Sequence, residues 1–184
     1  MINPTSSLET SHFPVMLDEV IKVCSPEKGG VHIDCTFGGG GYSRKLLQFS
    51  KTKVIALDRD QFVLDIAKNL KKNFLNRFSF YQKKFSLVNT INEGQLVDTV
   101  IFDLGLSSIQ LNNLERGFSF KSKKTLDMSM GLSDTSAQEV INNCSEDKLR
   151  TIIKSLGEEK EVVRIARNII KVRSRIKITK GDQL

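Results

Sequence analysis

The chain has 184 residues, which is enough for one ordinary domain and part of a second. Its hydrophobic content of 39% suits a globular core and excludes collagen-like, mucin-like or broadly disordered proteins. The net charge is +7, and segment 160–180 holds eight basic residues against one acid, Glu161, so the whole excess lies there. A basic patch on an otherwise neutral chain indicates a polyanionic partner such as RNA.

The cysteine and histidine content argues against metal and disulfide chemistry. Cys24, Cys35 and Cys144 lie far apart in the sequence, which favours reduced thiols over a disulfide framework or a zinc site. The only histidines are His12 and His32, so a histidine-based metal or hydrolase site cannot be assembled. Because we find no apolar signal core and no stretch of transmembrane length, we expect a cytoplasmic protein with no membrane or metal partner.

The apolar pattern predicts helices and strands that alternate along the first part of the chain. After a helix over 15–24, we expect strands at 31–36, 53–58, 77–82 and 97–103, with helices at 42–49, 60–74 and 86–93 between them. Asp60 is suited to cap the helix that it begins. Strands separated by helices of this length imply right-handed crossovers and an α/β fold with a doubly wound parallel sheet.

The pattern changes after Asp103. A loop-like stretch over 104–134 precedes three helical patterns, at 136–143, 146–156 and 158–174. We therefore predict an α/β domain over 1–110 and a helical module over 111–184. A doubly wound sheet usually has more than four strands, so we expect the sheet of this chain to be incomplete.

The tract 34–43, DCTFGGGGYS, separates the first strand from the next helix. Four glycines, Gly38 to Gly41, allow the backbone to turn sharply and to approach a ligand closely. Asp58 ends the second strand, where a carboxylate can accept hydrogen bonds from ribose hydroxyls. The combination favours a nucleotide-type cofactor site. A tight turn without a ligand is one alternative, and an NAD-dependent dehydrogenase is another, although GGGGYS lacks GxGxxG spacing.

Further residues in four places are candidates for function. Asp103 ends an apolar strand, at the crevice where ligands of parallel sheets bind, although it could simply cap a loop. Phe85 follows a strand, where position alone favours a core residue. The long loop contains Arg116, Phe118 and Phe120, which either anchor it or contact RNA. Arg164, Arg167 and Lys171 share one side of a helix, which is either solvated or binds the RNA backbone.

Several segments match one protein family in order. They are HFPVMLDEV (12–20), the glycine tract, ALDRD (56–60), FDLGLSS (102–108) and ERGFSF (115–120). Through them the chain resembles the MraW/RsmH methyltransferases, which methylate the N4 amine of a cytidine in small-subunit ribosomal RNA. The resemblance implies a class I, Rossmann-like enzyme that depends on S-adenosylmethionine, has a helical substrate domain inserted into its sheet, and acts on the small ribosomal subunit.

The resemblance also implies roles for individual residues. By position, the cofactor contacts of the family fall on Gly40, Gly41, Tyr42, Asp58, Phe85, Asp103 and Gln110. Tyr42 stands where the family usually has histidine. The chain matches only the N-terminal part of a full-length member, so a second hypothesis is an inactive remnant that binds cofactor or RNA without turnover.

The chemistry of the implied reaction suggests what Asp103 does. The amine of cytosine is a poor nucleophile because its lone pair is delocalised into the ring, so it needs acceptors for its N–H groups and alignment with the methyl donor. We hypothesise that Asp103 is such an acceptor or orients the cofactor, and that Ser107, Ser108 and Gln110 shape the pocket.

Overall fold

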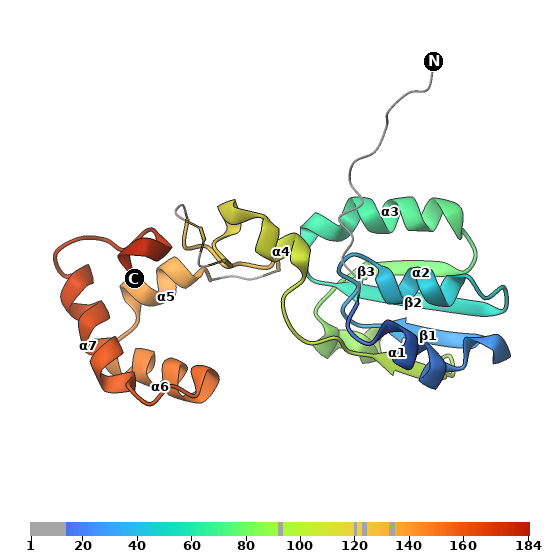
Figure 1. The fold of residues 1–184 in the computed structure, drawn as a ribbon, viewed down its shortest axis with the longest axis horizontal. Helices are drawn as coiled ribbons and strands as arrows, with labels where there is room; N and C mark the ends of the chain where they lie inside the picture. The colour runs from blue at the N-terminus through green and yellow to red at the C-terminus, as the bar shows by residue number, and fades with distance from the viewer. Residues whose placement is uncertain (1–13, 92–93, 120, 123–124, 133–134) are drawn as a thin grey trace, which may run out of the picture. The chain divides into compact units, whose positions relative to one another are not determined.

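The structure, a computed structural model, describes residues 14–91, 94–119, 121–122, 125–132 and 135–184. It divides into two compact units, the first ending at Ser108 and the second beginning at Ile109 (Figure 1).

The first unit is built on a four-stranded parallel sheet with the strand order β3-β2-β1-β4. The strands are β1 (Gly30–Asp34), β2 (Thr52–Asp58), β3 (Phe78–Gln82) and β4 (Thr99–Ile101). All three pairings are parallel, and Asp34 lies opposite Ala56 of β2 and Ile101 of β4. The predicted parallel α/β fold is therefore confirmed, and the carboxyl ends of the strands meet at one edge of the sheet.

Helices precede the first strand and connect the strands that follow. They are α1 (Leu17–Cys24), η1 (Pro26–Lys28), α2 (Gly41–Leu47), η2 (Gln61–Val63), α3 (Leu64–Asn73) and η3 (Phe85–Thr90). In Figure 1, α1, α2 and α3 follow one another across the sheet, with α2 packed on β2 and α3 on β3. The Asp60 carboxylate accepts a hydrogen bond from the Phe62 N–H at 3.1 Å, which confirms Asp60 as a cap.

The helix predicted over 86–93 was wrong in type. The structure has a 3₁₀ helix over Phe85–Thr90, with a kink at Leu87. Ser86, Asn89 and Thr90 explain the difference, because hydroxyl and amide side chains favour local hydrogen bonds over a regular α-helix. Thr90 makes such a bond, its hydroxyl donating to the Leu87 carbonyl at 2.7 Å.

Both sides of the sheet are covered. On one side Ile33, Cys35, Leu57 and Ile91 form a buried cluster. Side chains alternate between the two faces of a strand, so Val54 and Ala56 of β2 lie on the face opposite to Leu57. They are buried, as are Leu46 and Leu47 of α2.

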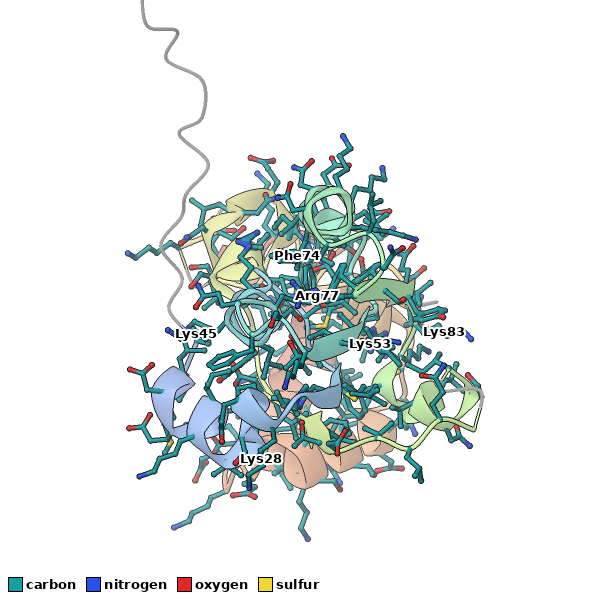
Figure 2. All side chains as sticks on the ribbon, turned by 90° about the vertical axis from the view of Figure 1, so that its right-hand side faces the viewer. Lys28, Lys45, Lys53, Phe74, Arg77 and Lys83 are labelled. Carbon is teal, nitrogen blue, oxygen red and sulfur yellow. The ribbon has the colours of Figure 1, made fainter. Side chains whose placement is uncertain are left out.

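At the amino end of the sheet Arg77 joins α2 to β3. Its guanidinium donates hydrogen bonds to the carbonyls of Leu47, Phe49 and Thr52, at 3.1, 2.9 and 3.3 Å. It also lies 5.1 Å from the ring centre of Phe74, its neighbour in Figure 2. Two of these carbonyls, those of Leu47 and Phe49, lie at or just after the end of α2, so Arg77 ties this helix end to the start of β3.

The second unit is helical. Its elements are α4 (Ser108–Asn112), which begins at the last residue of the first unit, η4 (Leu114–Arg116), α5 (Ala137–Asn143), α6 (Glu146–Gly157), α7 (Val162–Arg173) and η5 (Gly181–Gln183). Its core contains Leu126, Leu149, Ala166, Ile169 and Ile178. Ser136 and Ser145 cap α5 and α6. The sequence predicted that the helix now labelled α7 starts at residue 158, but it starts at Val162. Glu158 instead adopts a left-handed conformation (φ 50°) that ends α6.

Candidate functional site

The glycine tract forms a bend between β1 and α2. Gly38 and Gly40 have positive φ angles of 49° and 76°, which favour glycine, and α2 starts immediately afterwards at Gly41. The Gly38 N–H donates a hydrogen bond to Asp58 Oδ2 at 2.8 Å. This bond fixes the bend against the end of β2, so the glycines and the acid predicted to act together are neighbours.

Asp58 is the acid at the end of β2. Its second oxygen, Oδ1, accepts a hydrogen bond from the Asp60 N–H at 2.9 Å. Burial raises the pKa of the Asp58 carboxyl above its usual value, although the N–H groups of Asp60 and Gly38 oppose the shift. Because a carboxylate oxygen can accept more than one hydrogen bond, Asp58 can still bind the hydroxyls of a ligand.

The four glycines face different surroundings. A Cβ atom on Gly40 would lie 2.8 Å from the Phe37 ring, and one on Gly41 would lie 2.1 Å from Cγ of Pro14. A Cβ atom on Gly39 would meet nothing within 4 Å. Gly40 and Gly41 are therefore required for packing, while the backbone at Gly39 borders open space.

We expect Gly40→Ala to destabilise the protein by about 1–2 kcal/mol, because alanine is strained at a positive φ and would press on Phe37. Gly39→Ala is the matched control and should change stability little. Urea unfolding of both variants at the same pH measures the two effects. Equal stability of the two variants would contradict the packing role of Gly40.

Asp103 lies two residues beyond β4, next to the loop that follows β1 and to α2. Its N–H donates a hydrogen bond to Thr36 Oγ1 at 2.8 Å. The Tyr42 hydroxyl lies 3.5 Å from Asp103 Oδ2 and also donates to the Val15 carbonyl. Burial and the neighbouring Asp103 raise the pKa of Tyr42 to about 12, so the phenol keeps its proton at neutral pH and acts as a donor.

Asp34 is a site residue that sequence reasoning missed. Its carboxylate is completely buried and accepts hydrogen bonds from Ser43 Oγ at 2.7 Å and from the Thr36 N–H at 3.3 Å. Burial, with a smaller contribution from Asp58, raises the pKa of Asp34 to about 6. Asp34 thus joins the start of α2 to Thr36, which in turn holds Asp103. An acid at the end of a buried strand was the available signal, as for Asp58.

Phe85 and Ser107 complete the part of the candidate site in the first unit. Phe85 is 45% exposed and packs edge-on against Phe102 at 5.7 Å between ring centres, so it is not a core residue. The Cβ atom of Ser107 lies 3.7 Å from the position that a Cβ atom would take on Gly38. Ser108 is the first residue of α4.

In the second unit, Gln110 is buried within α4, and Arg116 is buried as well. The Arg116 guanidinium donates a hydrogen bond to the Ser129 carbonyl at 2.7 Å and lies 5.1 Å from the centre of the Phe118 ring. This favours the first of the two interpretations of Arg116 and Phe118, in which they anchor the long loop. Phe120 lies outside the described residues.

The predicted basic side chains of α7 are exposed on one side of the helix, opposite the buried Ala166 and Ile169. Arg164 forms an ion pair with Glu161 at 3.4 Å, and Arg167 forms one with Glu146 at 3.6 Å. Lys171 is exposed on the next turn. An open pocket is lined by Lys160, Glu161, Val163, Arg164, Arg167 and Asn168.

The described part of the chain has neither a membrane-spanning helix nor a cluster of metal-binding side chains. No helix there has both the length and the apolar character that crossing a membrane demands. Within the same residues, no three His, Cys, Asp or Glu side chains are grouped closely enough to hold a metal ion. The chemical groups that the first unit does bring together are a bare backbone bend, the buried Asp34, the partly buried Asp58, and Asp103 just beyond β4.

Comparison with known proteins gives a consistent result. The family model described as the MraW methylase family matches residues 9–184. "Ribosomal RNA small subunit methyltransferase H" of Rickettsia bellii (strain OSU 85-389) is 40% identical over 177 residues, which are 96% of this chain and 58% of the relative. The protein of the same name from Ehrlichia ruminantium (strain Welgevonden) is 39% identical over 178 residues, 94% of this chain and 59% of the relative. This chain thus spans less than two thirds of either relative, and it belongs to the MraW methylase family.

Proposed function

We propose that this protein transfers a methyl group from S-adenosylmethionine to the N4 amine of a cytidine in small-subunit ribosomal RNA. The observation that carries the proposal is the hydrogen bond from the Gly38 N–H to Asp58, with Asp103 at the end of the strand on the other side of β1. Membership of a methylase family and the names of the relatives support the reaction and the class of RNA. Such a substrate would place the protein in the cytoplasm.

The residues of the bend fit such a cofactor. Asp58 has acceptor capacity for ribose hydroxyls, and the exposed ring of Phe85 can stack on an adenine. The open space beside Gly39 lets the methionine part of the cofactor approach the backbone. When bound, S-adenosylmethionine would supply a methyl group made electrophilic by its positively charged sulfur.

Asp103 is the residue best suited to act on the cytosine. Its carboxylate can accept a hydrogen bond from the amine and so favour the geometry in which the nitrogen lone pair is available. Thr36 fixes the position of Asp103 through its backbone N–H, and the Tyr42 hydroxyl, which donates its proton to the Val15 carbonyl, lies 3.5 Å from Oδ2. A carboxylate held before the substrate arrives needs little rearrangement during the reaction.

The exposed side of α7 is the part of the second unit best suited to hold the RNA backbone. The ion pairs of Arg164 and Arg167 involve side chains that are 74% and 68% exposed, and pairs of this kind contribute little to stability. Both arginines can therefore exchange a glutamate for a phosphate, and Lys171 extends the surface by one turn. Arg116 is better assigned to the loop that it anchors.

The proposal predicts that S-adenosylmethionine raises the melting temperature of the protein and that NAD does not. Tritium transfer from the labelled cofactor to small ribosomal subunits then tests the reaction. The assay uses this chain and a chimera that continues into the C-terminal part of the Rickettsia bellii relative. A larger shift with NAD would favour a dehydrogenase, and cofactor binding without transfer in either form would favour a binding protein without turnover.

A further inference from the structure

The first unit carries a basic surface that the overall charge balance conceals. Residues 66–91 include six basic side chains and no acidic one. The structure uses some of them internally: Arg77 binds three carbonyls, and Lys83 donates a hydrogen bond to the Thr90 hydroxyl at 3.3 Å. The three lysines of α3 are exposed instead.

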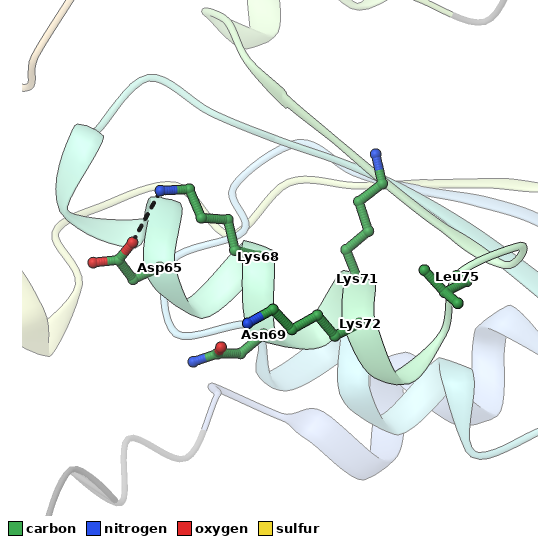
Figure 3. A pocket seen from close by; sticks show the side chains of 6 residues that line it. All are labelled: Asp65, Lys68, Asn69, Lys71, Lys72 and Leu75. Carbon is green, nitrogen blue, oxygen red and sulfur yellow. Dashed lines mark hydrogen bonds and ion pairs between the residues drawn. The ribbon is translucent and has the colours of Figure 1, made fainter.

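These lysines lie on the side of α3 that faces away from the sheet. Ala67 and Leu70 are buried on the inner side of the helix. On the outer side Lys68, Asn69, Lys71 and Lys72 border an open pocket, together with Asp65 and Leu75 (Figure 3). We call the set Lys68, Asn69, Lys71 and Lys72 the α3 basic face.

The cations of this face are available to a ligand. Lys68 pairs with Asp65 at 3.2 Å, but the two side chains are 69% and 91% exposed, so the pair is weak. Neither Lys71 nor Lys72 forms an ion pair or a side-chain hydrogen bond with any residue that the structure describes. In Figure 3 the Lys68 and Lys71 side chains extend from successive turns of the helix.

Charge and composition favour a nucleic-acid backbone as the ligand. Cations one helical turn apart can each contact a phosphate of an extended polyanion, and the Asn69 amide can donate a further hydrogen bond. A helix that binds a membrane surface presents several apolar side chains, whereas the only apolar residue at this pocket is Leu75. The helix dipole alone explains why lysines occur in the last turn, but it predicts no effect of these lysines on RNA binding.

We propose that the α3 basic face is a second RNA contact, which binds the phosphate backbone of the ribosomal RNA substrate. The inference rests on the proposed function in taking that RNA as the partner. It adds a contact on the cofactor-binding unit itself, on residues outside both the glycine bend and α7. An RNA held there is bound by the unit that also carries Asp103.

The test is the salt dependence of binding to protein-free small-subunit ribosomal RNA, measured by filter binding with the full chain. Each phosphate contact contributes roughly 0.7–0.9 to the slope of log K against log salt. The double variant Lys71→Gln/Lys72→Gln should therefore lower the slope by about 1.4–1.8. When the salt concentration rises from 50 to 200 mM, both proteins should bind RNA more weakly. The factor by which the affinity falls should be roughly ten times smaller for the variant than for the unmodified chain.

The matched control is Lys22→Gln/Lys28→Gln, which removes the same charge from exposed positions before β1. Figure 2 shows Lys28 well away from Phe74 and Arg77, which follow α3 in the sequence. The control should keep the slope of the unmodified chain. A slope unchanged in the α3 variant, or lowered equally in both variants, overturns the contact while leaving the proposed function intact. If the unmodified chain binds no RNA, the RNA partner of the proposed function fails, and this inference fails with it.

Discussion

Replacing Asp103 by asparagine is expected to lower kcat for methyl transfer about a hundred-fold, the range found when one positioned polar group is removed from a reacting centre. Asparagine keeps the size of the side chain and one acceptor oxygen, and the hydrogen bond to Thr36, which the backbone N–H of residue 103 donates, does not depend on the side chain. What is lost is the negative charge that favours an N–H donor as the nitrogen begins to form a bond. Single-turnover transfer from tritiated cofactor measures the effect.

The affinity for the cofactor separates the two roles considered for Asp103. If Asp103 acts on the amine, the dissociation constant of S-adenosylmethionine should change little while kcat falls. If Asp103 orients the cofactor, both should change. Asp65→Asn is the control, because this exposed aspartate of α3 lies outside the bend and should leave both quantities unchanged. Normal turnover together with normal affinity in Asp103→Asn would remove Asp103 from the mechanism.

The parts of the site that the sequence predicted depend on local patterns. An apolar run followed by glycines and a helical pattern marks the end of the first strand, and an apolar run that ends in an acid marks the end of the second. Parallel strands bring these carboxyl ends to one edge of the sheet. The nearness of Gly38 and Asp58 follows from that geometry without knowledge of any side-chain contact. The caps provided by Asp60 and Ser145 were predictable for the same reason, because a cap bonds to a backbone N–H two or three residues away.

The parts that could not be predicted depend on contacts between distant residues. The bond between the Thr36 hydroxyl and the Asp103 N–H spans 67 positions, and periodicity carries no information about it. The buried Arg116 donates a hydrogen bond to the Ser129 carbonyl, which lies in a loop without a regular sequence pattern. The sequence analysis missed the α3 basic face because it summed charge over all residues outside segment 160–180. In that sum the lysines of α3 are cancelled by acids that lie elsewhere in the fold.

Asp34 should make the stability of the protein depend on pH, in a direction opposite to that of most aspartates. Its pKa is about 6 in the folded protein, against 3.8 for an ordinary aspartate, so the folded state binds the proton more tightly than the unfolded state. The resulting stabilisation is fully present below about pH 4 and is lost as the pH rises through 6. Since one pKa unit is worth about 1.4 kcal/mol, the whole change is about 3 kcal/mol.

Asp34→Asn is therefore expected to abolish this contribution, because asparagine does not titrate. Urea unfolding of the chain and of the variant between pH 4 and 8 should show the stability difference, unmodified minus variant, falling by about 2.4 kcal/mol as the pH rises, because the first part of the change occurs below pH 4. Taking the difference cancels the titration of groups common to both proteins. A constant difference for Asp34→Asn would mean that Asp34 titrates alike in both states. In that case burial would not raise the pKa of Asp34, and its hydrogen bonds to Ser43 and Thr36 would be made by an ordinary carboxylate.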